Sequence, residues 1–294
     1  MPGSPPTYQH LLRAGTKRLT ETAIDTARLD AEVLLRELAG LDRAGLFLRL
    51  TDPAPDGLAV CYESLLERRA AGEPVAYVVA RREFMGLPFR VMPGVLIPRP
   101  ETELLVEWAL AFVADWPGAT VVDVGTGSGA IAVSLAALAS PRVRIVGTDI
   151  SPEALAIADA NAAALLDGGL RARLAFREGS LLEPIGEPVD VVLANLPYLT
   201  PGQVDGNPDL GAEPRLALDG GEDGLDLVRE LIAALPSVLT PGGAVGLELD
   251  PSQTATVEVL LSELFPSRSV RTIHDLAGLA RHVVLEPEPE PGMS

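Results

Sequence analysis

The sequence predicts an α/β protein in which a helical N-terminal segment precedes a larger domain built on a parallel sheet. In the second part of the chain, apolar β-branched runs alternate with alanine-rich segments of helical spacing, which is the pattern of strand–helix–strand units. Three glycines at alternate positions follow one of these runs, as expected where a buried strand turns tightly into a helix. Residues 7–72 show helical spacing instead.

The length and composition indicate two folded domains without a membrane segment. The chain has 294 residues, of which 47% are hydrophobic, and this length exceeds that of a typical single domain. No apolar run approaches the roughly 18 residues that a membrane span requires. The N-terminus lacks the basic start and apolar core of a signal peptide. These features predict a cytoplasmic protein that does not bind membranes.

Cysteine and histidine are too sparse to indicate a disulfide or a metal site. Cys61 is the single cysteine, which excludes an internal disulfide and fits a reducing cytoplasm. The histidines, His10, His274 and His282, are scattered and show no metal-ligand spacing. We therefore expect a site without a metal.

The formal net charge of −18 disfavours tight binding to nucleic acid. An acidic surface repels the phosphate backbone unless arginines cluster locally, and Lys17 is the sole lysine. A basic protein partner, or one already bound to RNA, remains compatible with this charge.

The first segment, residues 1–81, is predicted to be a small helical domain. Ala31, Leu34 and Leu35 fall on one face of a helix that ends at Gly40. No side chain in this segment suggests chemistry. The sequence therefore leaves open whether it is a docking module or a stabilising cap.

Residues 82–100 are predicted to form a β-hairpin linker. Two apolar stretches, residues 84–91 and 95–98, flank a turn at Met92–Gly94. The prolines and glycines of this region favour a stiff connection over a core strand. A helix follows from Pro100, with proline near its first turn and acidic residues that suit the helix dipole.

The glycine-rich turn, Gly125-Thr126-Gly127-Ser128-Gly129, is the first candidate binding site. Glycine allows dihedrals closed to other residues and lets a ligand press against bare backbone. The helix that begins beyond the turn offers free N–H groups. The spacing is not the G-x-G-x-x-G of dinucleotide-binding turns, which argues against a pyrophosphate ligand. A tight turn without a ligand is the alternative.

Asp149 ends the next apolar run, residues 143–148, and is the second candidate. An acidic residue about 20 positions after a glycine turn is well placed to hold both hydroxyls of a ribose. A helix cap before Ser151 is the competing interpretation. The glycine turn together with this aspartate resembles the S-adenosylmethionine site of Rossmann-like methyltransferases.

The tetrapeptide Asn195-Leu196-Pro197-Tyr198 follows a predicted buried strand and so lies where ligands bind in open α/β sheets. It is similar to the Asn-Pro-Pro-Tyr motif of methyltransferases that act on planar nitrogens. An amide nitrogen is a poor nucleophile because its lone pair is delocalised. Acceptors at Asn195 Oδ1 and the Leu196 carbonyl would hold its N–H groups toward the methyl donor. Tyr198 would stack on the flat group and Pro197 would fix the loop. The alternative is that Asn195 is only a turn residue and Tyr198 only a core aromatic.

Further stretches resemble the protein-glutamine methyltransferase family that modifies peptide-chain release factors. The most specific is Leu96–Glu103, and the others are Pro74–Tyr77, Arg82–Phe84, Glu213–Leu225 and Asp275–Gly278. The resemblance extends over nearly the whole chain apart from the tail. It implies a Rossmann-like class I methyltransferase domain on a seven-stranded sheet with a reversed last strand. It also implies an N-terminal helical domain that helps to recognise the substrate.

The resemblance implies the reaction as well. S-adenosylmethionine gives a methyl group to the glutamine amide in the Gly-Gly-Gln motif of class 1 release factors, which leaves S-adenosylhomocysteine. Arg99 and Glu101 are implied to lie on the substrate side, although by themselves they suit helix capping and a surface ion pair. The loop that contains Leu181 is implied to border the adenine. Ser180 stands where relatives usually have an acidic residue, and core packing of Leu181 is an equal alternative.

Three other functions fit parts of the pattern. Asn-Leu-Pro-Tyr is the form typical of ribosomal RNA adenine dimethyltransferases, but the net charge of −18 suits RNA or DNA poorly. A glutamine methyltransferase that modifies a ribosomal protein would share the same motifs. A degenerate module that only binds the donor fits less well, because the tetrapeptide at Asn195 is intact.

The predicted organisation has four parts. Residues 1–81 form a helical substrate-recognition domain, residues 82–100 the hairpin linker and residues 101–285 the catalytic domain. Residues 286–294, in which glutamate and proline alternate, are expected to be a disordered tail.

Overall fold

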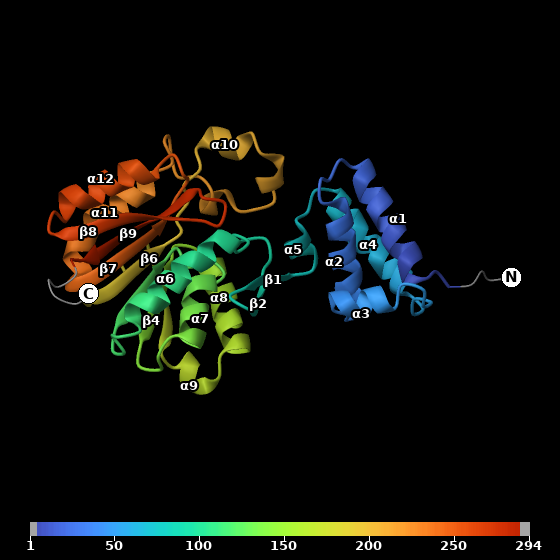
Figure 1. Ribbon diagram of the computed structural model, residues 1–294, viewed down its shortest axis with the longest axis horizontal. Helices are drawn as coiled ribbons and strands as arrows, with labels where there is room; N and C mark the ends of the chain where they lie inside the picture. The colour runs from blue at the N-terminus through green and yellow to red at the C-terminus, as the bar shows by residue number, and fades with distance from the viewer. Residues whose placement is uncertain (1–4, 289–294) are drawn as a thin grey trace. The chain divides into compact units, whose positions relative to one another are not determined.

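A computed structural model describes residues 5–288 of the chain. The chain divides into two compact units between Arg81 and Arg82 (Figure 1). Within the described residues, no helix has both the length and the apolar character that a membrane span needs.

The first unit is a helical bundle around an apolar core. Its helices are α1 (Tyr8–Glu21), α2 (Ala27–Ala39), α3 (Arg43–Leu48), α4 (Leu58–Ala70) and α5 (Val75–Val78). Leu34 and Leu35 of α2 are fully buried, and the Tyr62 hydroxyl of α4 donates a hydrogen bond of 2.9 Å to the Ala31 carbonyl. Gly40 ends α2 with a left-handed φ of 62°, as the sequence predicts.

The second unit is built on a seven-stranded sheet with the order β5-β4-β3-β6-β7-β9-β8. The strands are β3 (Thr120–Val124), β4 (Arg144–Asp149), β5 (Leu174–Glu178), β6 (Val189–Ala194), β7 (Leu239–Glu248), β8 (Arg268–His274) and β9 (Ala280–Pro287). β3 pairs in parallel with β4 and β6, whereas β9 runs antiparallel to both β7 and β8. The sheet therefore has the reversed strand that the family resemblance implies.

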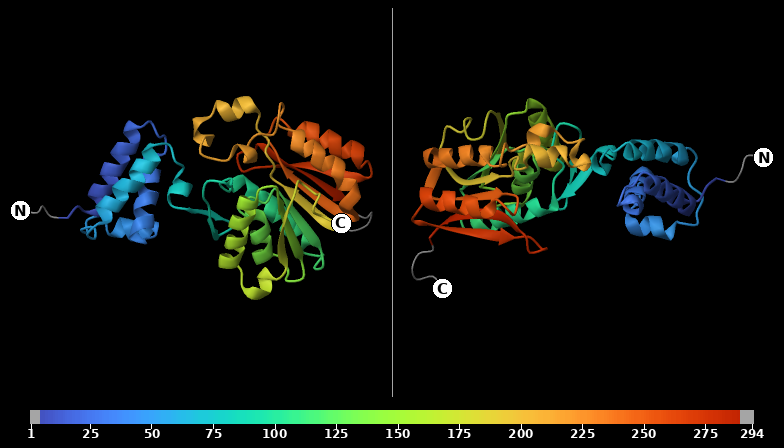
Figure 2. Two further views of the ribbon diagram at one scale, coloured as in Figure 1. Left: turned by 180° about the vertical axis from the view of Figure 1, so that it is seen from behind. Right: turned by 90° about the horizontal axis from the view of Figure 1, so that it is seen from above.

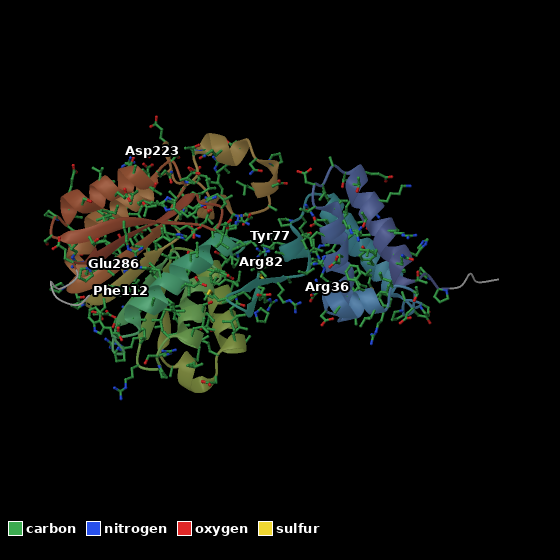
Figure 3. All side chains as sticks on the ribbon, in the orientation of Figure 1. Arg36, Tyr77, Arg82, Phe112, Asp223 and Glu286 are labelled. Carbon is green, nitrogen blue, oxygen red and sulfur yellow. The ribbon has the colours of Figure 1, made fainter. Side chains whose placement is uncertain are left out.

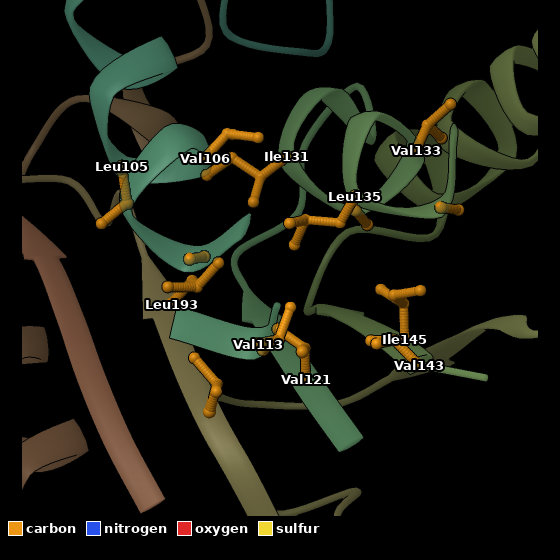
Figure 4. Packing of buried hydrophobic residues seen from close by; sticks show 14 of the residues in the cluster. Leu105, Val106, Val113, Val121, Ile131, Val133, Leu135, Val143, Ile145 and Leu193 are labelled. Carbon is orange, nitrogen blue, oxygen red and sulfur yellow. The ribbon is translucent and has the colours of Figure 1, made fainter. Parts of the chain in front are cut away.

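Helices cover both faces of this sheet (Figures 1 and 2). The longer ones are α6 (Glu103–Val113), α7 (Ala130–Leu138), α8 (Pro152–Leu165), α11 (Asp226–Val238) and α12 (Thr254–Leu264), and α9 (Gly168–Arg171) is a single turn. Side chains of α6, α7 and α8 share one buried cluster with Val121 (Figure 4). Side chains of α11 and α12 share another with Val122. Neighbouring residues of a strand point to opposite faces, so a central strand covered on both faces is buried at every position, as β3 is.

The hairpin lies earlier in the sequence than predicted. Its strands are β1 (Arg81–Phe84) and β2 (Leu87–Arg90), and the stretch 95–98 is not a strand. Met85 and Gly86 form the turn, with φ values of 52° and 72°. Positive φ at both central residues is the geometry whose twist suits a two-residue hairpin loop. The chain also turns at residues 92–95, where the Val95 N–H donates to the Met92 carbonyl over 3.4 Å, so the predicted turn is present, but it does not join the two strands of the hairpin as predicted.

The hairpin is packed into the second unit. Phe84 and Phe89 are both buried, and their rings meet edge to face with centroids 6.0 Å apart. Asn161 of α8 exchanges two hydrogen bonds with the Arg90 backbone and donates a third to the Ser128 carbonyl. Arg82, labelled in Figure 3, donates to the Pro98 carbonyl over 3.2 Å. These contacts connect the hairpin directly to the glycine-rich turn.

The start of the predicted disordered tail is ordered. β9 extends to Pro287, and Glu286 (Figure 3) accepts hydrogen bonds from Trp108 Nε1 and Arg271 Nε over 2.8 and 2.9 Å. The expectation of disorder is therefore wrong for the first residues of the stretch 286–294. Residues 289–294 lie outside the described part of the chain.

Candidate active site

The candidate site lies at the carboxyl edge of the sheet, between β3 and β6. These strands are parallel neighbours, with Val124 of β3 opposite Ala194 of β6. The next strand after β3 is β4, toward one edge of the sheet, and the next after β6 is β7, toward the other edge. Ligands of open α/β sheets bind where the strand order reverses in this way. A cavity opens there, and its lining includes the predicted site residues Gly125, Gly127, Asp149, Leu181, Asn195, Leu196 and Pro197.

The glycines of the turn adopt conformations that other residues rarely adopt. Gly125, Gly127 and Gly129 have φ values of 72°, 55° and 80°, in the left-handed region that favours glycine. The Gly125 N–H donates to the Thr148 carbonyl of β4 over 2.9 Å. A Cβ atom at Gly125 would lie 3.1 Å from the Leu196 side chain. Glycine at this position therefore lets the two loops of the site close on each other.

The other three residues of the turn, Thr126, Ser128 and Gly129, do not line the cavity. The Thr126 hydroxyl donates to Asp123 Oδ2 over 2.6 Å, and the Ser128 carbonyl accepts from Asn161 Nδ2 over 2.8 Å. Gly129 is the residue directly before α7. These three residues hold the shape of the turn, and direct contact with a cofactor stays a prediction for them.

Asp123 of β3 anchors the turn from inside the core. Its Oδ2 accepts hydrogen bonds from the Thr126 hydroxyl and from the Ala132 N–H in the first turn of α7. The residue is 1% exposed, and within the described structure its Oδ1 has no hydrogen-bond partner. The pKa of Asp123 is raised to about 7, chiefly by burial and in smaller part by nearby Asp149, while the two hydrogen bonds act in the opposite direction.

Asp149 connects the end of β4 to the glycine turn. Its Oδ2 accepts from the Gly127 N–H and its Oδ1 from the Ser151 N–H, each over 2.9 Å. The cap of α8 is Ser151, whose hydroxyl accepts from the Ala154 N–H over 3.1 Å, so the competing interpretation of Asp149 as the helix cap is wrong. A carboxylate offers about four acceptor positions, and those not used here remain for a ligand in the cavity.

Leu181 lies on the cavity wall in a strained conformation. Its φ is 47°, which is unusual for a residue with a side chain. The Thr148 hydroxyl donates to its carbonyl over 2.8 Å and holds this backbone against β4. Ser180 lines the cavity beside it. The predicted contact of Leu181 with adenine remains a prediction.

Asn195 leaves the carboxyl end of β6 with its side-chain amide anchored. Its Nδ2 donates to the Thr102 hydroxyl over 3.0 Å. Thr102 is 4% exposed and ends the short helix η1 (Pro100–Thr102), directly before α6. The described residues offer no donor to Asn195 Oδ1. The side chain therefore keeps an acceptor oxygen available in a cavity-lining position.

The long loop between residues 201 and 224 packs against the backbone of the tetrapeptide. It contains α10 (Pro201–Asp205), η2 (Pro208–Leu210) and η3 (Arg215–Ala217). A Cβ atom at Gly220 would lie 2.4 Å from the Pro197 carbonyl oxygen, and one at Gly224 would lie 2.1 Å from the Tyr198 carbonyl oxygen. Glycine is needed at both positions because the two backbones touch.

Tyr198 is partly buried, and Gln253 fixes its backbone. Gln253 Nε2 donates to the carbonyls of Tyr198 and Asp223, over 2.8 and 3.1 Å. Burial, with a smaller contribution from Glu248, raises the pKa of the Tyr198 phenol to about 12, so the phenol stays protonated at neutral pH. Tyr198 is not one of the residues that line the cavity, and its predicted stacking on a substrate stays a prediction.

Arg99, predicted on the substrate side, forms an ion pair with Glu213. Its Nη2 lies 2.5 Å from Glu213 Oε1, and the Glu213 side chain is only 2% exposed. Glu213 Oε2 also accepts from the Ile97 N–H over 3.0 Å. Glu213 therefore ties the segment before η1 to the loop of residues 201–224. Glu101 is partly exposed, and among the described residues its carboxylate has no hydrogen-bond partner.

Comparison with known proteins places the chain in a family. Residues 10–79 match the family model described as the PrmC N-terminal domain, and residues 116–248 match one described as a methyltransferase domain. The release factor glutamine methyltransferase of Moorella thermoacetica is 41% identical to this chain, over 94% of this chain and 96% of that protein. The chain belongs to the release factor glutamine methyltransferase family.

Other members of the release factor glutamine methyltransferase family show the same degree of similarity. That of Geobacter sulfurreducens is 43% identical over 81% of this chain and 82% of its own, and that of Cereibacter sphaeroides is 42% identical over 93% and 92%. A solved release factor-specific protein-(glutamine-N5) methyltransferase from Alicyclobacillus acidocaldarius is 32% identical, with a TM-score of 0.44, over 68% of this chain and 100% of that chain. The relatives confirm the family assignment, and the seven-stranded sheet confirms the predicted fold.

Several residues of this methyltransferase site have no role in the sequence analysis. Asp123 had an available signal, because it is an acidic residue inside an apolar run. Thr102 and Glu213 lie in two of the stretches that carry the family resemblance, residues 96–103 and 213–225, but nothing local gave either a role; Gln253 had no signal. Their importance comes from partners distant in the sequence, such as Asn195 at a separation of 93 residues.

The raised pKa of Asp123 predicts a pH-dependent stability. An unfolded chain releases this proton near 3.8, whereas the folded chain keeps it up to about pH 7. The folded state therefore loses stability as the pH rises from about 4 to about 7, by up to about 1.4 kcal/mol per pH unit. Asp123→Asn keeps one accepting oxygen and has no such proton.

We expect the unfolding free energy of Asp123→Asn to rise relative to that of the parent chain as the pH increases from 5 to 7. Urea unfolding across this range measures the difference. The exposed Asp115 provides the matched control, because Asp115→Asn should leave the slope with pH nearly unchanged. Equal slopes for the parent chain and Asp123→Asn would contradict the assigned titration.

Proposed function

We propose that this member of the family transfers a methyl group from S-adenosylmethionine to the side-chain amide nitrogen of the glutamine in the Gly-Gly-Gln motif of class 1 release factors. The observation that supports this most directly is the position of Asn195. It lines the same cavity as the glycine turn, and its NH₂ group is committed to Thr102. The N–H groups of a substrate amide would thus find an accepting oxygen next to the glycine turn, which is the proposed binding site of the methyl donor (the donor cradle).

The residues on the β3–β4 side of the cavity fit the proposed methyl donor. Gly125 and Gly127 present backbone without side chains, and Asp149 retains acceptor positions for the ribose hydroxyls. Leu181 offers an apolar contact for the adenine. When bound, S-adenosylmethionine supplies a methyl group that is activated by attachment to a sulfonium.

The chain contributes orientation of the amide nucleophile. Two acceptors, Asn195 Oδ1 and the Leu196 carbonyl, would take the two N–H groups of the glutamine and direct its nitrogen toward the donor. As the nitrogen pyramidalises and gains positive charge, both contacts strengthen, and this favours the transition state. Tyr198 cannot act as a base near neutral pH, because burial raises the pKa of its phenol to about 12. The proton leaves to solvent after the transfer.

The helical unit is proposed to recognise the release factor, and the whole protein to act in the cytoplasm. Residues 10–79 of this unit match the PrmC N-terminal domain. We propose a protein substrate and not naked nucleic acid, because the net charge is −18.

The first test is to find where the methyl group goes. The full-length protein is incubated with methyl-labelled S-adenosylmethionine, a class 1 release factor, ribosomal proteins and RNA together. We expect label on one glutamine of the release factor and none after replacement of that glutamine by alanine. A chain that starts at Arg82 should bind the donor but label the release factor poorly. Label on RNA or on a ribosomal protein instead would overturn the proposal.

Two substitutions in the tetrapeptide test the mechanism. Asn195→Ala removes the acceptor oxygen and should lower the single-turnover rate about 100-fold or more, as for loss of one preorganised contact. Leu196→Pro keeps the backbone carbonyl and should leave this rate within a few-fold. Because Leu196 is 4% exposed and packs in the core, we expect Leu196→Pro to unfold at a lower temperature.

The rates are measured with donor and release factor both saturating, so that binding and transfer are separated. A parent-like rate for Asn195→Ala under these conditions would exclude the catalytic role of Asn195. A large loss in Leu196→Pro without loss of folded protein would show that the leucine side chain itself matters.

Asp149→Ala tests the donor site. The substitution removes charge-assisted hydrogen bonds, each of which contributes about 1.5–3 kcal/mol, so we expect the dissociation constant for S-adenosylmethionine to rise at least tenfold. Calorimetric titration measures it. Asp159 offers a matched control, because it is an exposed aspartate of α8 that is paired with Arg171. An unchanged dissociation constant would limit Asp149 to holding the glycine turn.

A further inference from the structure

Thr102, which lies directly before α6, contacts the loop Asn195–Tyr198, called the acceptor loop below because it is proposed to bind the substrate amide. Its hydroxyl oxygen accepts the hydrogen bond from Asn195 Nδ2 over 3.0 Å. Both ends of this contact are held in place. Asn195 follows directly from the buried strand β6, and Thr102 is 4% exposed. The contact therefore joins two rigid elements.

The segment around Thr102 is fixed by three further contacts. The Thr102 N–H donates to the Arg99 carbonyl over 3.2 Å, and Arg99 is paired with the buried carboxylate of Glu213. Glu103 Oε1 accepts from the Met85 N–H over 2.7 Å. The Thr102 oxygen is thus a preorganised acceptor, and little conformational freedom is lost when it binds the asparagine amide.

An asparagine amide has two ends of similar shape and opposite hydrogen-bonding character. Rotation by about 180° about its last torsion exchanges the accepting oxygen for the donating NH₂ group. If Asn195 presented NH₂ to the cavity, it would place a donor against the N–H groups of a substrate amide. The orientation of this one amide therefore decides between attraction and repulsion of the nucleophile.

We propose that Thr102 is a positioning residue that holds the Asn195 side chain in the conformation in which Oδ1 faces the cavity. The inference rests on the proposed function, since it requires Asn195 Oδ1 to accept from the glutamine. Without the threonine hydroxyl, Nδ2 would lose this partner, and the Asn195 side chain would no longer be anchored to the segment before α6. Rotation of the freed amide would then present its NH₂ group to the cavity in part of the molecules.

Thr102→Val tests this, because valine has nearly the shape of threonine but no hydroxyl. Thr102→Ser is the matched control, because it keeps the oxygen. We expect Thr102→Val to lower the single-turnover rate about 10- to 100-fold at saturating substrates, with the donor dissociation constant and the KM for release factor within about twofold of the parent values. Thr102→Ser should retain the rate within a few-fold.

A double-mutant cycle with Asn195→Ala shows whether Thr102 acts through the asparagine. In the Asn195→Ala background, adding Thr102→Val should change the remaining rate less than twofold, because no amide is left to orient. A further loss of the same size in this background would overturn the inference, as would equal losses in Thr102→Val and Thr102→Ser. A purely structural function of Thr102 would produce either result.

The outcomes separate this inference from the proposed function. If Asn195→Ala loses activity and Thr102→Val transfers methyl at the parent rate, the positioning role is wrong and the proposed function stands. If Asn195→Ala itself transfers at the parent rate, the acceptor mechanism fails, and the inference about Thr102 fails with it. Unfolding temperatures of all variants confirm that the rates are those of folded protein.

Discussion

The site depends on the parallel register of β3 and β6. Because Val124 lies opposite Ala194, the glycine turn after β3 and the tetrapeptide after β6 leave the sheet at the same height. Gly125 then approaches Leu196 so closely that a Cβ atom would be 3.1 Å from its side chain. The register of the two strands therefore places the proposed donor cradle beside the proposed acceptor loop, and a shift in register would separate them.

The acceptor loop has no secondary structure of its own, so other segments must hold it. Thr102 binds the Asn195 side chain, Gly220 and Gly224 allow a second backbone to pack on the loop, and Gln253 bridges the two. Each contact offsets part of the conformational entropy that ordering a loop costs. This explains why stretches far apart in the chain accompany the tetrapeptide in the family pattern. They brace one short loop from different directions.

The donor side has a different character, because it is acidic and buried. Asp123 lies buried under the glycine turn, and its pKa is raised to about 7, mainly by burial and in part by Asp149 beside the turn. The carboxylate of Asp149, which lines the cavity, favours a ligand with positive charge, as the proposed sulfonium donor has. The net charge of −18 is thus compatible with a site for a cationic small molecule and a protein partner.

The sequence by itself determined the order of strands and helices, the glycine turn, Asp149 and the tetrapeptide. These are local signals, since hydrophobic periodicity and turn chemistry depend on neighbouring residues. This region contains two turns, and the hairpin forms at Met85–Gly86, where Phe84 packs against Phe89, and not at residues 92–94 as predicted. No local pattern distinguishes them.

Only the tertiary structure decided the partners of the polar residues. Thr102 and Asn195 are 93 residues apart, and Arg99 and Glu213 are 114 apart. Trp108 and Arg271 donate to the Glu286 carboxylate and hold it in the last strand. The surrounding sequence, in which glutamate and proline alternate, is by itself typical of disorder. A polar side chain finds its partner through the packing of the elements that hold it, and that packing is a property of the whole fold.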